Sequence, residues 1–313
     1  MRPSDDVLTA FGLTGPARPL VGGQGESYRA GDAVLKPAGD VEEAEWAARV
    51  LGGLPSGAGF RVPRPLPARD GGHVAHGWSA TEFTEGTPLT DGPPSTDGAL
   101  KRDDPSGRGG LSGRDGLSGR DGVSGRDGLS GRDGSSGRDG SGRDGRWLEL
   151  LVAGRAFHRA LRSVPRPALL DRRDHAWAVA DRIAWGERAP VEGPAGLLER
   201  LRRLPAPPEA PSRLVHGDLT GNVLFHPGHP PAVIDFSPYW RPTGYAEAVV
   251  VADGLLYHGA HPALVEEVDG GARMVARALV FRLATSVLLP GDIPDEEVER
   301  FVHATTVIEA AAR

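Results

Sequence analysis

The chain contains no cysteine. This absence excludes disulfide bonds, catalytic thiolates, and zinc or iron–sulfur sites with cysteine ligands. A strong excess of one charge is also lacking, because 36 Lys and Arg stand against 42 Asp and Glu, for a net charge of −6. A mildly acidic protein of this kind is a poor candidate for binding nucleic acid or an anionic membrane.

Long apolar runs are absent as well, and no secretory leader is expected from the first residues. No run approaches the roughly 18 apolar residues of a membrane-spanning helix. The first residues, M-R-P-S-D-D-V-L-T-A-F-G, lack a basic segment followed by an apolar core. We therefore expect a cytoplasmic protein with no membrane partner and no nucleic-acid partner. With 313 residues the chain is long enough for one large domain or two lobes.

The most informative stretch is residues 214–238, L-V-H-G-D-L-T-G-N-V-L-F-H-P-G-H-P-P-A-V-I-D-F-S-P. Two short apolar runs flank a turn rich in proline, glycine and histidine, which predicts a β-hairpin. The hairpin would bring Asp218, Asn222 and Asp235 to one end. Two carboxylates and an amide suit the holding of Mg²⁺ and the orientation of a hydroxyl group. An ordinary polar turn is the alternative interpretation.

The order H-G-D, asparagine, hairpin and I-D-F resembles the catalytic core of the aminoglycoside phosphotransferase family, small-molecule kinases with a protein-kinase-like fold. The resemblance implies that Asp218 is the catalytic base, that Asn222 and Asp235 hold Mg²⁺, and that His216 braces the catalytic loop. In that family the asparagine lies five residues after the aspartate, whereas Asn222 lies four after Asp218. Either Gly221 absorbs the tighter path, or metal coordination is altered.

A glycine loop at residues 22–27 is predicted between two strands near the N-terminus. Glycines let backbone N–H groups approach phosphate oxygens, so Gly23, Gly25 and Ser27 are candidate nucleotide contacts. The loop lacks the third glycine of the dinucleotide fingerprint, and no P-loop motif occurs. A plain hairpin turn is the alternative. Lys36 closes the following strand and resembles the kinase lysine that contacts the α and β phosphates.

The next helix, expected over residues 41–51, carries three candidates for the glutamate that holds this lysine in the kinase fold: Glu42, Glu43 and Glu45. We predict Glu43, because it borders the apolar stripe of the helix. Further on, G-W-S-A-T-E-F-T-E-G resembles the last strand and hinge of the family. By that resemblance the backbone around Glu82 and Glu85 would bind the adenine edge, although a plain interlobe linker fits the same residues.

Residues 96–146 differ from the rest of the chain, because the unit S-G-R-D-G recurs there with a period of six. Such a segment has too few apolar side chains to offset its ordering entropy, so a disordered insertion is predicted. A calcium-binding β-roll is a poor alternative, because its repeat has nine residues and a different motif.

The region after the insertion predicts an amphipathic helix over residues 147–164, with His158 as a packing or capping residue rather than a ligand. Trp177 and Trp185 are candidates for the acceptor site or for the core. By resemblance Glu247 would support the catalytic loop, and Arg241 would contact phosphate or acceptor.

We therefore predict an α+β, bilobal protein-kinase-like fold with a small β-rich lobe and a larger, mainly helical lobe. The expected segments are 1–86 (nucleotide-binding lobe), 87–95 (hinge), 96–146 (insertion) and 147–313 (catalytic and substrate lobe). The predicted activity is Mg²⁺-assisted transfer of the γ-phosphate of ATP, or of GTP, to a hydroxyl of a small acceptor, by a monomer or weak dimer. A pseudokinase-like nucleotide-binding or interaction protein is the alternative, because the catalytic loop is short and the glycine loop incomplete. A structural repeat protein is a third hypothesis.

Overall fold

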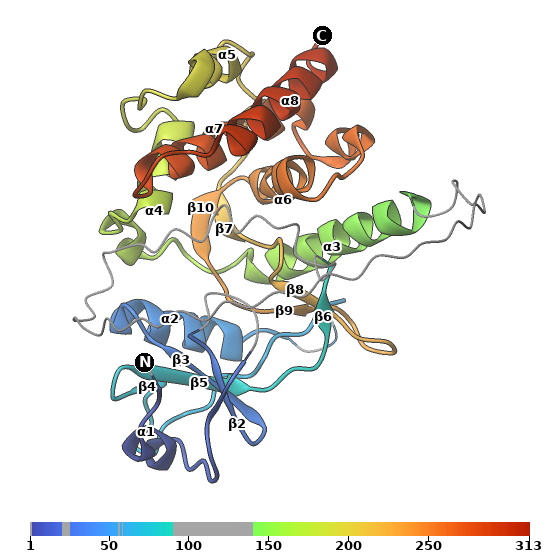
Figure 1. Cartoon of the computed structure of the whole chain (residues 1–313). Coiled ribbons are helices and arrows are strands. Elements are labelled where there is room, and N and C mark those ends of the chain that lie inside the picture. The colour runs from blue at the N-terminus through green and yellow to red at the C-terminus, as the bar shows by residue number, and fades with distance from the viewer. Residues whose placement is uncertain (1, 21–25, 56, 58, 90–139) are drawn as a thin grey trace, which may run out of the picture.

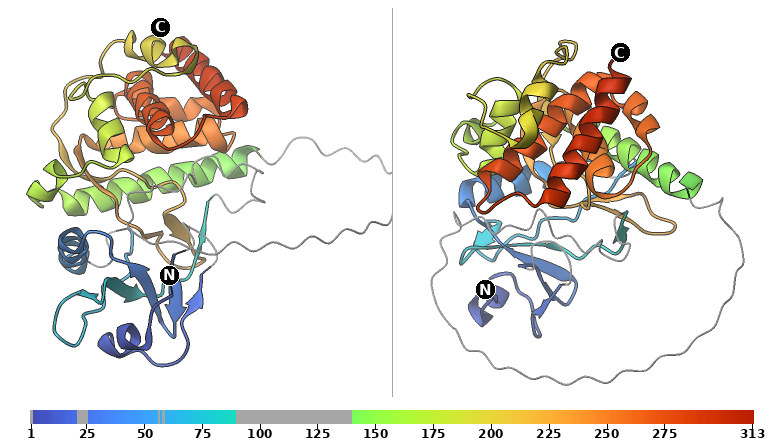
Figure 2. Two further views of the ribbon diagram at one scale, coloured as in Figure 1. Left: turned by 60° about the vertical axis from the view of Figure 1, so that its left-hand side comes forward. Right: turned by 45° about the horizontal axis from the view of Figure 1, so that its top comes forward.

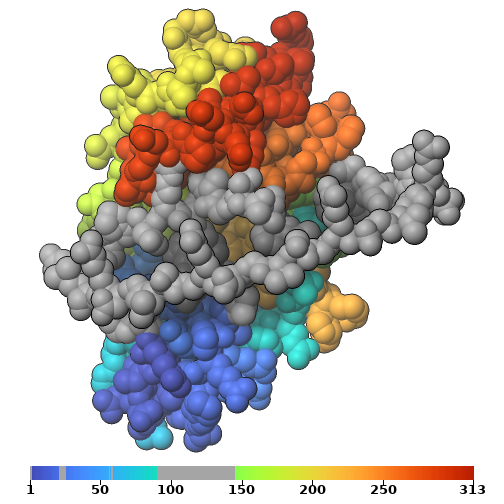
Figure 3. Space-filling view, in the orientation of Figure 1, coloured from blue at the N-terminus to red at the C-terminus, as the bar shows by residue number. Residues whose placement is uncertain are grey.

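The computed structural model describes residues 2–20, 26–55, 57, 59–89 and 140–313. These residues form a small N-terminal lobe around a sheet and a larger, mainly helical C-terminal lobe (Figure 1). The lobes lie at opposite ends of the molecule (Figure 3). The predicted α+β fold class is therefore confirmed. Gly23, Gly25 and most of the predicted insertion lie outside the described residues.

The N-terminal lobe is an antiparallel sheet with the strand order β1-β2-β3-β5-β4. Its strands are β1 (Arg18–Pro19), β2 (Tyr28–Ala30), β3 (Ala33–Pro37), β4 (Val74–Ala75) and β5 (Trp78–Glu82). Two helices accompany it, α1 (Asp5–Ala10) and α2 (Val41–Gly52). Side chains alternate between the two faces of a strand. Leu35 is fully buried in the core of this lobe, and Lys36 therefore points to the opposite face.

The C-terminal lobe consists largely of helices. They are α3 (Gly140–Leu161), α4 (Ala176–Ala184), α5 (Leu197–Arg202), α6 (Thr243–Tyr257), α7 (Gly271–Leu288) and α8 (Asp295–Ala311), with short 3₁₀ turns η1 (Ala168–Asp171), η2 (Pro194–Gly196) and η3 (Pro262–Glu267). Helix α3 runs along the base of this lobe, facing the N-terminal lobe (Figure 2). Within the described part of the chain, no helix is both long and apolar enough to cross a membrane.

Helix α3 begins earlier than expected, at Gly140. Residues 140–146 were predicted to belong to the disordered insertion, and the structure corrects that boundary. The buried Trp147, Leu150, Leu151 and Phe157 anchor the helix in the core. Extending an anchored helix needs no new nucleus, so a weak helix-forming segment can continue it toward the N-terminus.

Helix α6 is the central element of the lobe, because nearly every one of its residues is buried. It contains the run Val249–Val251, whose β-branched side chains favour strands in isolation. A helix that is apolar all round is stable only when neighbours cover every side. Helices α3, α7 and α8 and strand β7 supply that cover.

Four short strands and β6 lie near the junction of the lobes. Strand β7 (Arg213–His216) pairs with β10 (Pro238–Arg241), and β8 (Val223–Phe225) pairs with β9 (Ala232–Val233) and with β6 (Thr87–Pro88). The β8–β9 pair is the predicted hairpin. Strand β6 carries the chain across from the N-terminal lobe, so the first residues of the predicted hinge lie beside the hairpin (Figure 1).

Candidate active site

The loop between β7 and β8 is held by the fully buried ring of His216. Its Nε2–H donates to the carbonyl of Ile234 at 3.0 Å, while Nδ1 accepts from the backbone N–H groups of Asp218 at 3.2 Å and Ser237 at 3.4 Å. Both ring nitrogens are therefore used by the neutral imidazole, and burial lowers the pKa of His216. One ring thus connects the loop to the segment that carries Asp235.

Two glycines allow the loop its tight path. Gly217 lies against Tyr239, and a β-carbon there would collide with the ring. Gly221 has φ +79°, a conformation that glycine adopts without steric cost. The sequence predicts that Gly221 accommodates a loop that is one residue shorter than in the family. As a result Asn222 stays beside Asp218, with its side-chain nitrogen 2.7 Å from the Asp218 carbonyl.

Asn222 and Asp235 lie next to each other across the hairpin, because the N–H of Ile234 donates to the carbonyl of Asn222 at 2.9 Å. Asp235 itself has φ +51°, which is uncommon for a residue other than glycine. Strained backbone of this kind persists only where its surroundings hold it, and it concentrates at functional sites. The geometry brings an amide and a carboxylate, both hard oxygen donors, to one end of the hairpin.

No group of three or more His, Asp or Glu side chains that could hold a metal occurs in the described ranges. A cage made only of histidine and carboxylate side chains is thus not formed in those ranges. Mg²⁺ usually keeps several waters and binds through one or two carboxylates plus substrate phosphates. Asn222 and Asp235 fit that smaller requirement.

Lys36 forms an ion pair with Asp235 rather than with Glu43. The predicted Lys36–Glu43 pair is therefore absent from the described structure, and this prediction is corrected. Glu43 instead forms a two-fold ion pair with Arg173, including a 3.0 Å bond to Nε, and Arg173 also donates to the carbonyl of Pro238. A guanidinium presents a planar fork that matches a carboxylate, so it competes well for this partner.

The other two glutamates of α2 that were candidates for pairing with Lys36 also have other partners. Glu42 pairs with Arg172, and Glu45 accepts from the backbone N–H groups of His73 at 2.6 Å and Val74 at 2.9 Å. Arg172 and Arg173 belong to the C-terminal lobe, so α2 is tied to that lobe by two arginines that follow η1.

The structure reduces the number of hinge backbone groups that could bind the adenine edge. The N–H of Glu82 donates to the carbonyl of Arg64 at 2.8 Å, and the carbonyl of Glu85 accepts from Arg61 at 2.6 Å. These two backbone groups already have partners within the protein. Ser27 lies at the end of the glycine loop, where its carbonyl accepts from the N–H of Leu20 at 2.8 Å and holds the loop ends together.

A cavity of about 370 Å³ opens beside Asp218. Its lining includes the aromatic residues Trp177, Tyr239, Tyr257 and Phe281. The acceptor-site hypothesis for Trp177 is thus consistent with the structure. Trp185 does not line this cavity. It is half-buried and packs against the core, edge-on to Tyr245 and under the guanidinium of Arg277, which favours the core alternative for Trp185.

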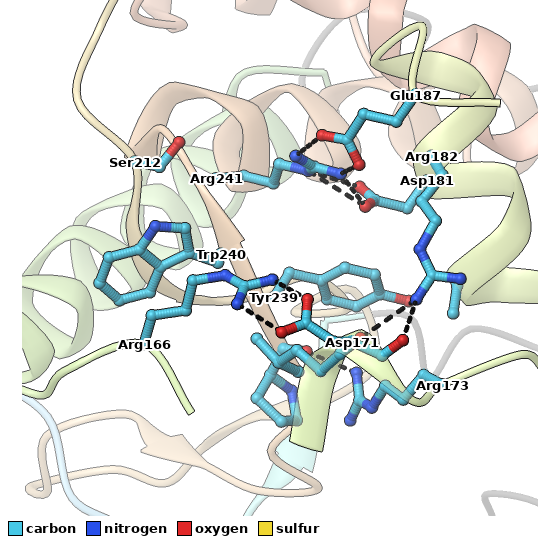
Figure 4. Close-up of a pocket in the computed structure, with 13 residues that line it drawn as sticks. Arg166, Asp171, Arg173, Asp181, Arg182, Glu187, Ser212, Tyr239, Trp240 and Arg241 are labelled. Carbon is cyan, nitrogen blue, oxygen red and sulfur yellow. Dashed lines mark hydrogen bonds and ion pairs between the residues drawn. The ribbon is translucent and has the colours of Figure 1, made fainter. Parts of the chain in front are cut away.

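A second, polar cavity of about 240 Å³ lies on the other side of Tyr239, and Figure 4 shows its side chains. Arg241 points into a pair of carboxylates there, with bonds of 2.6 Å to Asp181 and 2.9 Å to Glu187. Arg166 pairs with Asp171. The proposal that Arg241 contacts phosphate or acceptor is therefore not supported, because its donors are engaged by two carboxylates.

The predicted support of the catalytic loop by Glu247 is also wrong. Glu247 pairs with Arg155 of α3 through bonds of 2.9 and 2.8 Å. Asp253, six residues further along α6, reaches the loop region instead, through Arg282 of α7. Sequence reasoning missed both residues, although each is a charge inside an otherwise apolar helical run. Buried charges require partners, so such positions were a usable signal.

His158 is the packing residue that was predicted. It is buried on α3, and its Nε2 accepts from the N–H of His216 at 3.1 Å. Burial lowers the pKa of His158 from its ordinary value of 6.5 to about 3. Below pH 6.5 His158 therefore binds a proton in the unfolded chain but not in the folded protein. The free energy of unfolding decreases as the pH falls from 6.5 toward 3.

We expect His158→Gln to reduce this acid sensitivity, because a glutamine oxygen can accept the same hydrogen bond without titrating. The histidine costs about 2 kcal/mol of unfolding free energy at pH 5 relative to pH 8. Urea unfolding of both proteins at the two pH values measures the difference, with the exposed His303→Gln as the control. An unchanged pH dependence in His158→Gln would contradict the assignment.

Residues 120–239 match the model of the phosphotransferase enzyme family, APH. The match includes the H-G-D loop, Asn222 and the I-D-F block, so this segment is similar to that family. No curated protein matches the chain.

Solved structures of similar fold include a choline/ethanolamine kinase family protein from Mesorhizobium loti, with 17% identity, a TM-score of 0.50, and coverage of 96% of this chain and 94% of that one. A microcompartment-associated aminopropanol kinase has 16% identity, a TM-score of 0.51, and coverage of 97% and 94%. At such identities the likeness establishes the fold alone.

Proposed function

We propose that the protein transfers the γ-phosphate of ATP, or of GTP, to a hydroxyl group of a small molecule. One observation carries the proposal. Lys36, Asp218, Asn222 and Asp235 come from two lobes and three segments. Lys36 pairs with Asp235, Asn222 lies beside Asp218, and a cavity of about 370 Å³ opens at Asp218. Few other activities require a lysine, an amide and two carboxylates in this arrangement.

Each residue has a role that follows from its chemistry. Asp218 lines the cavity and would accept the proton of the acceptor hydroxyl. Asn222 and Asp235 would hold Mg²⁺, which neutralises charge on the phosphates when bound. The ammonium of Lys36, which lies against Asp235, would contact the α and β phosphates. Catalysis of this type depends mainly on positioning and electrostatics.

The glycine loop would cover the phosphates through backbone N–H groups of Gly23 and Gly25 and through Ser27. The described ends of the loop support this proposal, because the N–H of Leu20 donates to the carbonyl of Ser27 and holds the two ends together between β1 and β2. Glu82 and Glu85 mark the hinge beside which the purine would lie. The N–H of Phe83 is engaged as well, since it donates to the carbonyl of Asp32 at 2.7 Å, so the adenine edge would bind hinge backbone groups other than these three.

The test is a transfer assay with labelled ATP or GTP, with and without Mg²⁺. Amino alcohols enter the acceptor panel first, because the two solved structures of similar fold are named for kinases of such compounds. Aminoglycosides and simple sugars follow. Mg²⁺-dependent labelling of an acceptor supports the proposal. Nucleotide binding without transfer to any acceptor would favour the pseudokinase alternative instead.

A further inference from the structure

Arg282 of α7 occupies an unusual position for a charged residue. Its side chain is 5% exposed, yet it lies at the wall of the cavity that contains Asp218. It donates to both oxygens of Asp253, from Nε at 2.7 Å and from Nη2 at 2.6 Å. Nη2 also donates to Oδ1 of Asp218 at 2.9 Å.

The two carboxylates differ in their surroundings. Asp253 is buried on α6, with 5% of its side chain exposed, whereas 47% of the Asp218 side chain is exposed. A buried guanidinium is tolerated only when paired, and Asp253 provides a bidentate partner from the adjacent helix. Helices α6 and α7 pack closely along their length, so this pair has a fixed place in the core.

The anchored guanidinium restricts the Asp218 carboxylate. Oδ1 is held by Arg282, while Oδ2 has a longer contact of 3.4 Å with the side-chain nitrogen of Asn222. Oδ2 is therefore the oxygen less engaged by the protein. A base acts efficiently only when the accepting atom is held in reach of the proton, and small displacements cost rate steeply.

We propose that Arg282 is a positioning residue, which holds Oδ1 of Asp218 so that Oδ2 receives the proton of the acceptor hydroxyl. Asp253 anchors Arg282 in this role. The inference rests on the proposed function, because it assigns Asp218 as the base. In the transfer step Oδ2 takes the hydroxyl proton, the acceptor oxygen forms a bond to the γ-phosphorus, and the bond from that phosphorus to the bridging oxygen breaks, leaving ADP.

Kinetics of Arg282→Met and Arg282→Lys, on the acceptor found in the panel, test the role. We expect Arg282→Met to lower kcat about a hundredfold with little change in KM for ATP, and Arg282→Lys to recover part of the loss. Arg277→Met is the matched control, since Arg277 lies on the same helix but contacts the carbonyl of Ala184. It should retain kcat.

The double variant Asp218→Asn/Arg282→Met separates positioning from a general structural effect. Residues that act as one unit give non-additive losses, so the double variant should be no slower than Asp218→Asn alone. A further, multiplicative loss, or an unchanged kcat in Arg282→Met, would overturn the proposal.

A readout that needs no turnover keeps the two proposals distinguishable. The Nη2–H signal of Arg282, the group that donates to Asp218, is assigned in the NMR spectrum of arginine-labelled protein by its loss in Arg282→Lys. We expect that signal to shift in Asp218→Asn, while the signal of Arg277 stays in place. An unshifted Arg282 signal overturns the contact itself. If Asp218→Asn shifts the Arg282 signal but the wild-type protein has no transfer activity, the contact is retained. The proposed function, and with it the catalytic role of Arg282, is then refuted.

Discussion

Asp218→Asn is expected to reduce phosphoryl transfer by about a thousandfold, within the range that a positioned general base contributes. Asparagine has nearly the same shape, and its side chain can still meet Arg282, but it cannot accept the hydroxyl proton. Nucleotide binding should change little, because Lys36, Asn222 and Asp235 remain. The measurement is kcat for the best acceptor, together with calorimetric titration of ATP and Mg²⁺.

The control for this experiment is Asp292→Asn, which makes the same chemical change at an exposed loop position. It should transfer phosphate at the wild-type rate. Equal transfer rates in Asp218→Asn and wild type would remove Asp218 from the mechanism, since the fold of both proteins can be compared by their thermal unfolding.

The second large effect is expected at Asp235. We predict that Asp235→Asn weakens the binding of ATP in the presence of Mg²⁺ by about a hundredfold, or about 3 kcal/mol, because it removes the carboxylate that would hold Mg²⁺ against the phosphates. The affinity should also lose its dependence on Mg²⁺, because the carboxylate ligand is gone. Asparagine tolerates the positive φ of this position, so the hairpin should stay intact.

Lys36→Ala serves as the companion variant in the same titrations. It removes the phosphate contact but leaves both proposed metal ligands, so binding should weaken while the dependence on Mg²⁺ remains. Identical titration curves for wild type and both variants would refute the proposed nucleotide site. The absence of any ATP binding by folded wild-type protein would refute it as well.

Local features of this protein follow from local residues. The β8–β9 hairpin follows from two apolar runs around a Pro-Gly turn, and Gly221 accommodates the short catalytic loop because only its own backbone is involved. The burial of His158 is also predictable from the sequence, since its side chain lies on the apolar face of a helix. These features were accessible from sequence because they depend on neighbours within a few residues.

The ion-pair partners of the charged residues could not be predicted from neighbouring residues in the sequence. Arg173 meets Glu43 across 130 residues, and Arg282 meets Asp218 across 64. Such pairings depend on which helices pack together and at which register. The resemblance to kinases suggested Glu43 for Lys36 and Glu247 for the catalytic loop, and the structure assigns different partners to both.

The amino-acid sequence by itself thus determined the fold class, the hairpin with its three polar residues, and the loop that holds Asp218. Only the tertiary structure decided that Lys36 lies against Asp235 and that Arg282, anchored by Asp253, holds the Asp218 carboxylate. The physical reason is the range of the interactions. Backbone conformation responds to adjacent residues, whereas a buried charge takes whichever opposite charge the packing of distant helices brings within hydrogen-bonding distance.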